Sequence, residues 1–247
     1  MKKWIKQLLY PIRKAMGRFI IAPPRIQGYI NNNTIISKAA TIVQTDKIKG
    51  DYLEFGVWTG KSFVEAYKTI EKISNHWITE PHWFEKLWTK KRFFAFDSFE
   101  GLPKPSGVDC LSQAFRQGLF CAKENDFKKF IVSKGVPLDR VTIVPGWFEN
   151  TLNEGTRMKY DMKYASIVHI DCDLYESAAL ALNFVTPLLV DGSIIIFDDW
   201  YNFRGNPNLG EQRACREWIK SNPDWILTQF QKEGPWRNSF IANKRDI

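Results

Sequence analysis

Hydrophobic and polar residues follow two alternating patterns along most of the chain. Short apolar runs are typical of buried strands, whereas apolar residues three and four positions apart are typical of amphipathic helices. The runs predict strands at 52–56, 93–97, 141–145, 167–171 and 193–198. Between and after them, the helical pattern predicts helices at 62–72, 125–133, 176–189 and 211–221, the last of which ends at Asn222-Pro223.

Strands that alternate with helices predict an α/β fold, in which a parallel sheet has helices on both faces. Two further strands, at 226–230 and 238–242, are separated by a short loop that contains Gly234 and Pro235. This loop is too short for a parallel crossover. The sequence therefore predicts a mostly parallel sheet that ends in an antiparallel hairpin.

The first fifty residues have a different pattern and are interpreted as a helical arm. Apolar residues recur there at helical spacing with basic residues between them, namely Ile5, Leu8, Leu9, Ile12, Met16, Phe19 and Ile20. Pro11 kinks or divides this helix, and Pro23 and Pro24 end it. A second helical stretch has Ile35, Ile36, Ala39, Ile42 and Val43 on one face. We therefore divide the chain into an arm at 1–50 and one α/β domain at 51–247.

The net charge of +8 is concentrated in this arm. Residues 1–50 contain ten basic residues and one acidic residue, which leaves 25 basic and 26 acidic residues in 51–247. A nearly neutral domain is not expected to bind nucleic acid. Three roles fit the basic arm, and the sequence leaves them open: contact with an anionic membrane surface, packing against a second subunit, or a cover over the core.

Apolar runs and cysteines indicate the compartment. The most apolar stretch, at 178–190, is interrupted by Asn183, Thr186 and Pro187, so it is not expected to span a membrane. Lys6 interrupts the N-terminal apolar stretch, which therefore does not resemble a secretory signal. The four cysteines include no C-x-x-C pair, which argues against a zinc site and a disulfide framework. We expect a cytoplasmic protein, with peripheral membrane contact through the arm as the alternative.

The ends of the first two strands predict a cofactor site, because ligands of open parallel sheets bind beyond the carboxyl ends of the strands. A turn with glycines at 56 and 60 follows the first strand and lets backbone N–H groups approach a ligand closely. Asp97 ends the second strand, where an acid commonly holds a ribose. A turn that only packs a helix, and an Asp that only caps the next segment, are the alternatives. Together the two features favour a ligand that contains a nucleoside.

Four carboxylates follow the next two strands and predict a metal site. Asp171 and Asp173 follow the fourth strand, and Asp198 and Asp199 follow the fifth. Neighbouring strands lie about 4.8 Å apart, and carboxylates brought so close repel one another unless a cation binds them. Oxygen ligands favour magnesium, manganese or calcium over zinc. The alternative is that one pair caps a helix and the other faces solvent. His169 is expected to support the sheet, with metal binding as its alternative role.

Several segments together resemble the macrocin O-methyltransferase family. The matching segments are 53–58 (LEFGVW), 96–103 (FDSFEGLP), 146–152 (GWFENTL), 169–177 (HIDCDLYES) and 198–200 (DDW). Members of that family depend on S-adenosylmethionine and magnesium, and they methylate sugar hydroxyls in macrolide, aminocoumarin and related pathways. The resemblance implies a class I methyltransferase fold, that is, a Rossmann-like sheet of seven strands.

The resemblance also implies a role for each candidate residue. The cofactor is expected to lie across Glu54, Gly56, Gly60 and Ser62, with its ribose at Asp97. Ser98 is expected to bind the cofactor as well. Asp171, Asp198 and Asp199 match the magnesium ligands of the family, and Asp173 matches its proposed general base. The chain departs from the family at Thr59-Gly60-Lys61, where an arginine and paired glycines are common, and at Trp200, where a tyrosine is common.

These observations predict an O-methyltransferase that transfers a methyl group from S-adenosylmethionine to a hydroxyl, expected to belong to a sugar. A cation chelated by the sugar lowers the pKa of the hydroxyl, and Asp173 takes its proton. Asp173 lies on the same side as Asp171 if the chain stays extended there. The acceptor is expected to be a small molecule or a glycan, and the enzyme a homodimer. The competing prediction is a metal-dependent glycosyltransferase that uses Asp171-Cys172-Asp173 as a D-x-D motif.

Overall fold

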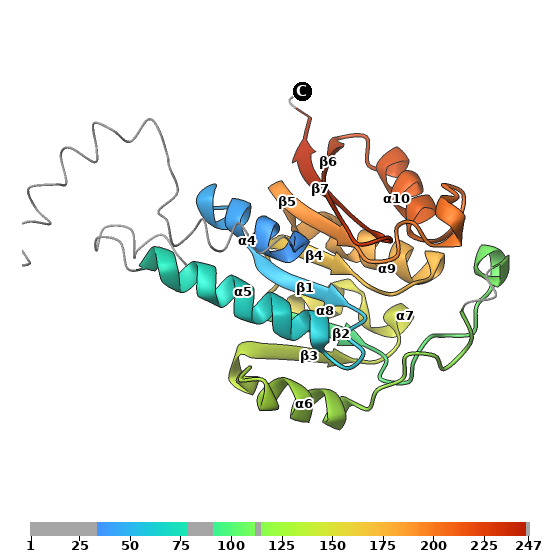
Figure 1. Ribbon diagram of the computed structural model, residues 1–247. Helices are drawn as coiled ribbons and strands as arrows, with labels where there is room; N and C mark the ends of the chain where they lie inside the picture. The colour runs from blue at the N-terminus through green and yellow to red at the C-terminus, as the bar shows by residue number, and fades with distance from the viewer. Residues whose placement is uncertain (1–33, 79–90, 112–114, 246–247) are drawn as a thin grey trace, which may run out of the picture. The chain divides into compact units, whose positions relative to one another are not determined.

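The computed structural model describes residues 34–78, 91–111 and 115–245. Seven strands form one sheet in the order β3-β2-β1-β4-β5-β7-β6 (Figure 1). Strands β1 to β5 are parallel, whereas β7 runs antiparallel to both β5 and β6. This confirms the predicted mostly parallel sheet that ends in an antiparallel hairpin.

The strands lie where the apolar runs predict them. Their bounds are β1 Asp51–Phe55, β2 Phe93–Asp97, β3 Val141–Pro145, β4 Ala165–Ile170, β5 Leu189–Phe197, β6 Trp225–Glu233 and β7 Arg237–Lys244. β2 and β3 match the predicted ranges, and β5 begins four residues earlier than predicted, at Leu189. The cause is Pro187, which cannot continue a helix. The preceding helix ends at Val185, and a single 3₁₀ turn at Thr186–Leu188 leads into β5.

Helices cover both faces of the sheet (Figure 1). The α-helices are α4 Ile35–Thr45, α5 Lys61–Ile78, α6 Glu124–Ser133, α7 Phe148–Thr151, α8 Glu154–Lys159, α9 Tyr175–Val185 and α10 Gly210–Ser221. Short 3₁₀ helices also occur at Gly107–Leu111, Leu138–Arg140 and Phe203–Gly205. The sequence analysis did not predict α7 and α8, which have four and six residues. Such helices are too short to show a hydrophobic period.

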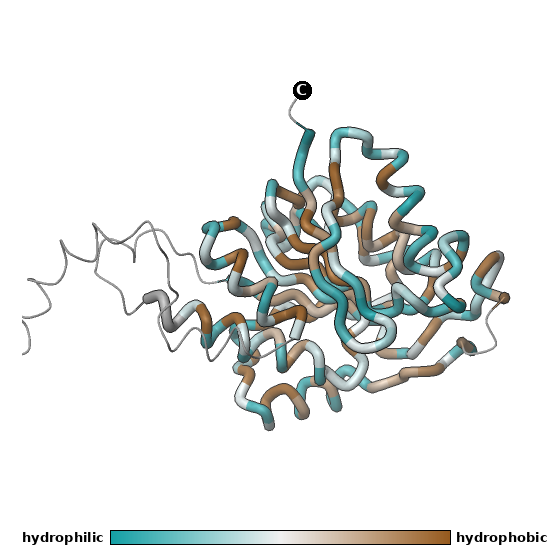
Figure 2. The backbone as a smooth tube through the Cα atoms, turned by 45° about the horizontal axis from the view of Figure 1, so that its top comes forward, coloured by the Kyte–Doolittle hydropathy of each residue, from teal (hydrophilic) through white to brown (hydrophobic). Residues whose placement is uncertain are grey.

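Two hydrophobic cores lie on opposite faces of the sheet, because successive strand residues point to opposite sides. Tyr52, Ile167 and Ile194 pack with α4, α5 and α6 in one core. The residues that follow them, Leu53, Val168 and Ile195, pack with α9 and α10 in the other. In Figure 2 the inner strands are mainly hydrophobic, whereas the β6–β7 hairpin is largely hydrophilic. Strands β1, β2 and β4 are therefore buried on both sides, whereas β3 at the edge of the sheet is mostly half-buried.

The compact unit that contains the sheet begins at Thr34. Helix α4 is therefore part of this unit, although the sequence analysis places it in the arm at 1–50. The N-terminal amphipathic helix predicted from Ile5 to Ile20 lies outside the described residues. Within the described ranges, no helix is both long enough and apolar enough to cross a membrane. All four cysteines are free thiols.

Candidate active site

A cavity of about 400 Å³ lies at the carboxyl ends of the parallel strands. The turns after β1, β2, β4 and β5 line it together with the start of α7 and the β6–β7 turn. Its lining includes Gly56, Val57, Trp58, Thr59, Lys61, Ser62, Asp97, Ser98, Leu102, Phe120, Trp147, Phe148, Glu149, Asp171, Cys172, Asp173, Asp198, Asp199, Trp236 and Arg237. Eight of the ten residues predicted for the site are in this cavity wall.

The turn after β1 depends on glycine for a close approach. Gly56 has a φ of 87°, and a Cβ atom added to it lies only 1.8 Å from the carbonyl oxygen of Asp171. A side chain there forces the β1 turn and the β4 loop apart. Gly60 has the same φ, but a Cβ on it meets the ring of Phe127 in α6 at 2.8 Å. Gly56 therefore shapes the cavity, and Gly60 lets the turn pack against α6.

Asp97 holds the β1 turn in place from the end of β2. Its Oδ2 accepts hydrogen bonds from the backbone N–H groups of Val57 (2.8 Å) and Trp58 (3.0 Å), and its Oδ1 accepts from Phe99 (2.7 Å). Burial raises the pKa of Asp97, although these three donors oppose the rise. A carboxylate has about four acceptor sites. Asp97 can therefore hold the turn and still accept a hydroxyl of a ligand in the cavity.

Four carboxylates converge at the ends of β4 and β5, as the sequence predicts. The strands are neighbours, with Ile170 paired to Phe197, and oxygens of Asp171, Asp198 and Asp199 lie within 4.8 Å of one another. Burial and the charges of its neighbours raise the pKa of Asp171 far above its usual range and that of Asp199 to about 7. A set of oxygen donors with such repulsion fits a divalent cation, which removes the repulsion.

The backbone at Asp173 is not extended, and the expectation of an extended chain there is wrong. Asp173 has a φ of 62°, in the left-handed region that favours glycine. The N–H of Leu174 donates to the carbonyl of Cys172 (2.6 Å), which closes a tight turn. This turn keeps the carboxyl of Asp173 in the cavity, where it shares a hydrogen bond with Asp199. Burial, then the charges of Asp199 and Asp171, raise its pKa well above the usual range.

Two cationic side chains keep Asp198 ionised. Its Oδ1 accepts hydrogen bonds from His169 Nε2 (3.3 Å) and from Arg237 Nε. Burial alone raises the pKa of Asp198, but these partners lower it below its usual value. Arg237 also donates to Glu233 (3.1 Å). The sequence analysis did not identify Arg237, because it approaches the site only when β7 pairs with β5.

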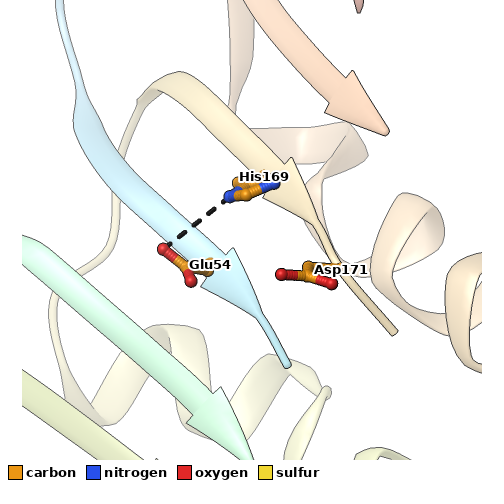
Figure 3. A group of neighbouring side chains, drawn as sticks. All are labelled: Glu54, His169 and Asp171. Carbon is orange, nitrogen blue, oxygen red and sulfur yellow. Dashed lines mark ion pairs between the residues drawn. The ribbon is translucent and has the colours of Figure 1, made fainter. Parts of the chain in front are cut away.

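Glu54 and His169 form a buried polar pair under the carboxylates. Figure 3 shows Glu54 on β1, and His169 and Asp171 at the end of β4, with the ion pair of 3.8 Å between Glu54 Oε2 and His169 Nδ1. Burial alone lowers the pKa of His169, but its bonds to Asp198 and Glu54 raise it to about 10. Glu54 is fully buried and meets the cavity through Ser62, whose hydroxyl donates to its Oε1 (2.6 Å).

Two buried acids outside the cavity position its loops, and the sequence analysis did not identify either. Asp109 accepts the N–H groups of Tyr175 (2.9 Å) and Glu176 (3.4 Å), and so ties the loop after β2 to the N-terminus of α9. Glu211 accepts the N–H of Asp199 (2.9 Å). Both are 1% exposed. Their partners are distant in the sequence or belong to the backbone, so no motif indicates these contacts.

Comparison with known proteins identifies the relatives of the chain. A model of the macrocin O-methyltransferase (TylF) family matches residues 32–217. A curated relative, 8-demethyl-8-(2,3-dimethoxy-alpha-L-rhamnosyl)-tetracenomycin-C 4'-O-methyltransferase of Streptomyces olivaceus, is 27% identical over 164 residues, which are 64% of this chain and 56% of that protein. Demethyldecarbamoylnovobiocin O-methyltransferase of Streptomyces niveus is 22% identical over 63% of this chain and 54% of that protein. The matches thus span little more than half the length of these relatives.

Solved structures share the fold. The O-methyltransferase NovP superposes with a TM-score of 0.67 at 19% identity, over 85% of this chain and 78% of that chain. The calicheamicin methyltransferase CalS11 superposes with a TM-score of 0.63 at 21% identity, over 96% and 91% of the two chains. At these identities the similarity shows the fold alone, and it confirms the predicted class I methyltransferase architecture.

Proposed function

The chain belongs to the macrocin O-methyltransferase family, and from this premise we propose that it transfers a methyl group from S-adenosylmethionine to a hydroxyl of a sugar, with the help of magnesium. The observation that carries the proposal is the composition of one cavity. A close-approach glycine turn and Asp97 line it together with four carboxylates at the next strand ends. The first pair of features suits a nucleoside, and the carboxylates suit a divalent cation.

The cofactor part of the cavity fits S-adenosylmethionine. Gly56 lets the backbone of the turn approach a ligand without a side chain between them. In this proposal Asp97 accepts the ribose hydroxyls, and Ser98, which also lines the cavity, contributes to binding of the cofactor. The hydroxyl of Ser62 donates its hydrogen bond to Glu54, so its oxygen remains free to accept a hydrogen bond from an ammonium group of the cofactor. Glu54 acts through Ser62 in this proposal, and Gly60 acts through the packing of the turn.

The metal part of the cavity fits magnesium. Asp171, Asp198 and Asp199 supply its oxygen ligands. His169 bonds the carboxylate of Asp198, and Glu211 holds the backbone of Asp199 in place. When bound, the cation supplies a Lewis acid that orients the acceptor hydroxyl and lowers its pKa.

Asp173 is the general base in this proposal. Its carboxyl lines the cavity beside the three ligands but is not a member of their cluster. Asp173 removes the proton of the acceptor hydroxyl, while the cavity wall holds that oxygen in line with the methyl group. The methyl–sulfur bond breaks as the methyl–oxygen bond forms, and S-adenosylhomocysteine leaves as the neutral sulfide.

The charges in the cavity support a cationic cofactor and an acceptor whose reacting sugar is neutral. Lys61 and Arg237 are the two basic residues of the described lining, which also has six acids: Asp97, Glu149, Asp171, Asp173, Asp198 and Asp199. This excess suits a sulfonium and a divalent cation, and it disfavours negative charge on the part of the acceptor that enters the cavity. A neutral sugar hydroxyl fits, and the name of the Streptomyces olivaceus relative gives that enzyme a rhamnosyl substrate. We propose a small molecule or a glycan as the acceptor, and no nucleic acid.

The remaining parts of the proposal concern assembly and compartment. We propose a cytoplasmic homodimer in which the basic N-terminal arm contributes to the subunit contact. Contact of that arm with a membrane surface is the alternative role. The glycosyltransferase alternative is not favoured, because the family and the related structures are methyltransferases and because Asp171 pairs with Asp198 and Asp199 to form the candidate metal site.

Calorimetry and an activity screen test the proposal. The full chain is titrated with S-adenosylhomocysteine, uridine diphosphate and NAD in parallel, with and without magnesium. We expect binding of S-adenosylhomocysteine, and methyl transfer to a nucleotide-linked sugar, a lipid-linked glycan or a glycosylated natural product. Chelator should abolish transfer, and added magnesium should restore it. Magnesium-dependent binding of uridine diphosphate alone contradicts the proposal, and full activity in chelator contradicts its metal part.

A further inference from the structure

A chain of buried hydrogen bonds joins the cofactor part of the cavity to the metal part. At one end the hydroxyl of Ser62 donates to Glu54 Oε1 (2.6 Å), and the hydroxyl of Tyr52 donates to Glu54 Oε2. The oxygen of Tyr52 lies 3.3 Å from His169 Nδ1. At the other end His169 Nε2 lies 3.3 Å from Asp198 Oδ1. Five side chains thus connect α5, β1, β4 and the loop after β5.

The two ends of this buried chain open into the same cavity, while its middle is closed to solvent. Ser62 and Asp198 both line the cavity. Tyr52, Glu54 and His169 are each 0% exposed. Water cannot replace a hydrogen bond broken at a fully buried group. A displacement at one end is therefore transmitted through these bonds and is not absorbed by solvent.

The donors and acceptors of the buried chain match one another without a conflict. Tyr52 has a single proton and gives it to Glu54, so its oxygen accepts from His169 Nδ1. Asp198 is a carboxylate acceptor, so His169 donates to it from Nε2. Both ring nitrogens are donors only in an imidazolium. His169 thus links Glu54, through Tyr52, to Asp198, so that one carboxylate lies in each half of the site.

Each end keeps an acceptor for a ligand. The hydroxyl of Ser62 donates its hydrogen bond to Glu54, so its oxygen can accept a hydrogen bond from the cofactor. Oδ1 of Asp198 accepts hydrogen bonds from both His169 and Arg237, which leaves Oδ2 to bind a divalent cation. A ligand bound at either end therefore fixes the side chain whose other bonds enter the buried chain.

We propose that this buried chain makes the binding of cofactor and of divalent cation cooperative, with Tyr52 and His169 as the positioning residues. The inference rests on the proposed function. A ligand at one end restricts the rotamers of the five side chains, so the second ligand loses less conformational entropy when it binds. The two ligands then strengthen each other by the same factor, because coupling between sites is reciprocal.

Calorimetry with S-adenosylhomocysteine and magnesium tests the inference. This ligand lacks the sulfonium charge, so its direct electrostatic interaction with the cation is small. In the full chain we expect magnesium to tighten S-adenosylhomocysteine about fivefold or more, and S-adenosylhomocysteine to tighten magnesium by the same factor. Equal affinities with and without the other ligand, or weaker ones, overturn the inference.

The variant Tyr52→Phe keeps the ring in the core but removes the hydroxyl that bridges Glu54 and His169, and leaves only their ion pair of 3.8 Å, which is too long for a hydrogen bond. We expect the coupling factor to fall to within about twofold of one, while each ligand still binds alone. Tyr175→Phe is the matched control, because it also removes a hydroxyl that donates to a glutamate, here Glu217 (2.6 Å), but outside the buried chain. It should keep the coupling of the original chain. Unchanged coupling in Tyr52→Phe overturns the inference.

A second variant decides the matter if Tyr52→Phe does not fold, as judged by circular dichroism and melting. His169→Gln breaks the buried chain at its next link, since an amide cannot donate to Tyr52 and Asp198 as the two ring nitrogens do. It should lose the coupling as well, and retained coupling contradicts the inference. Failure of S-adenosylhomocysteine to bind the original chain under any condition is a different result, because it contradicts the proposed function itself.

Discussion

At the scale of single residues, the carboxylate of Asp97 binds the backbone of the turn after β1 and, in the proposed function, also binds the cofactor. The backbone N–H groups of Val57 and Trp58 bind its carboxylate and so hold the turn after β1, and the N–H of Phe99 binds it from the loop after β2. In the proposed function the same carboxylate also accepts the ribose hydroxyls. Loss of the side chain therefore affects the turn and the ligand together, whereas loss of the charge alone weakens each contact.

We expect Asp97→Ala to weaken the binding of S-adenosylmethionine at least about tenfold, because each lost charge-assisted hydrogen bond contributes about 1.5–3 kcal/mol. Asp97→Asn should have a smaller effect, since the amide oxygen still accepts. The affinities are measured by calorimetry, and Asp139→Ala, at an exposed aspartate of the turn before β3, is the control. Unchanged affinity in a folded Asp97→Ala variant contradicts the placement of the ribose.

Asp171 and Asp173 differ in role, although they are two residues apart. If Asp173 is the base, Asp173→Asn should lower kcat by about 10²–10⁴ and leave the binding of magnesium and cofactor largely intact. Asp171→Asn should lose magnesium along with the activity, because it removes a charged ligand. Magnesium titration and single-turnover methyl transfer on both variants separate these roles. Equal loss of magnesium in the two variants identifies Asp173 as a ligand and makes His169 the next candidate for the base.

At the scale of elements, the sequence predicts helices and strands well where burial determines which positions are apolar. β2 matches its predicted range because Phe93 to Phe96 form a continuous buried apolar run, and β3 matches although it is mostly half-buried. The acidic cluster is predictable for the same reason, since parallel neighbours bring their carboxyl ends together. The left-handed backbone at Asp173, the approach of Arg237 and the cap that Asp109 gives to α9 depend on tertiary contacts. No local pattern predicts such contacts.

Lys91, which lies just before β2, joins the segment before β1 to the start of β4 at the other end of the sheet. Its ammonium donates to the carbonyls of Ile48 (3.3 Å) and Gly50 (2.8 Å) and to the hydroxyl of Ser166 (2.7 Å). Burial lowers the pKa of Lys91 from 10.5 to about 8. The folded chain therefore releases this proton at lower pH than the unfolded chain does.

The free energy of unfolding should consequently rise with pH between about 8 and 10.5, where the unfolded chain binds more protons at this lysine. Across this pH range, Lys91 should raise the free energy of unfolding by about 3 kcal/mol in total. Lys91→Met should remove this part of the rise, as measured by urea unfolding across that pH range. Lys68→Met, at an exposed lysine of α5, is the control and should keep the original slope. The same slope in both variants contradicts the assignment to Lys91.

At the scale of the whole molecule, the excess of basic residues and the predicted site residues lie in different parts of the sequence. All ten residues predicted for the site lie in the compact unit that begins at Thr34. Residues 1–33 contain seven basic residues and no acidic one, and the proposed function gives them a role in the subunit contact. Binding at the site and assembly of subunits should therefore be separable by deletion.

We expect deletion of residues 1–33 to convert a homodimer into a monomer, because it removes the amphipathic helix predicted to pack against the second subunit. The affinity for S-adenosylhomocysteine should stay within about twofold of the original, since the deletion removes no residue of the site. Light scattering coupled to size-exclusion chromatography measures the mass, and calorimetry measures the affinity. A truncated chain that remains dimeric contradicts this role of the arm. Sedimentation with phosphatidylserine vesicles then tests the membrane alternative, in which only the full chain should bind and increasing salt should release it.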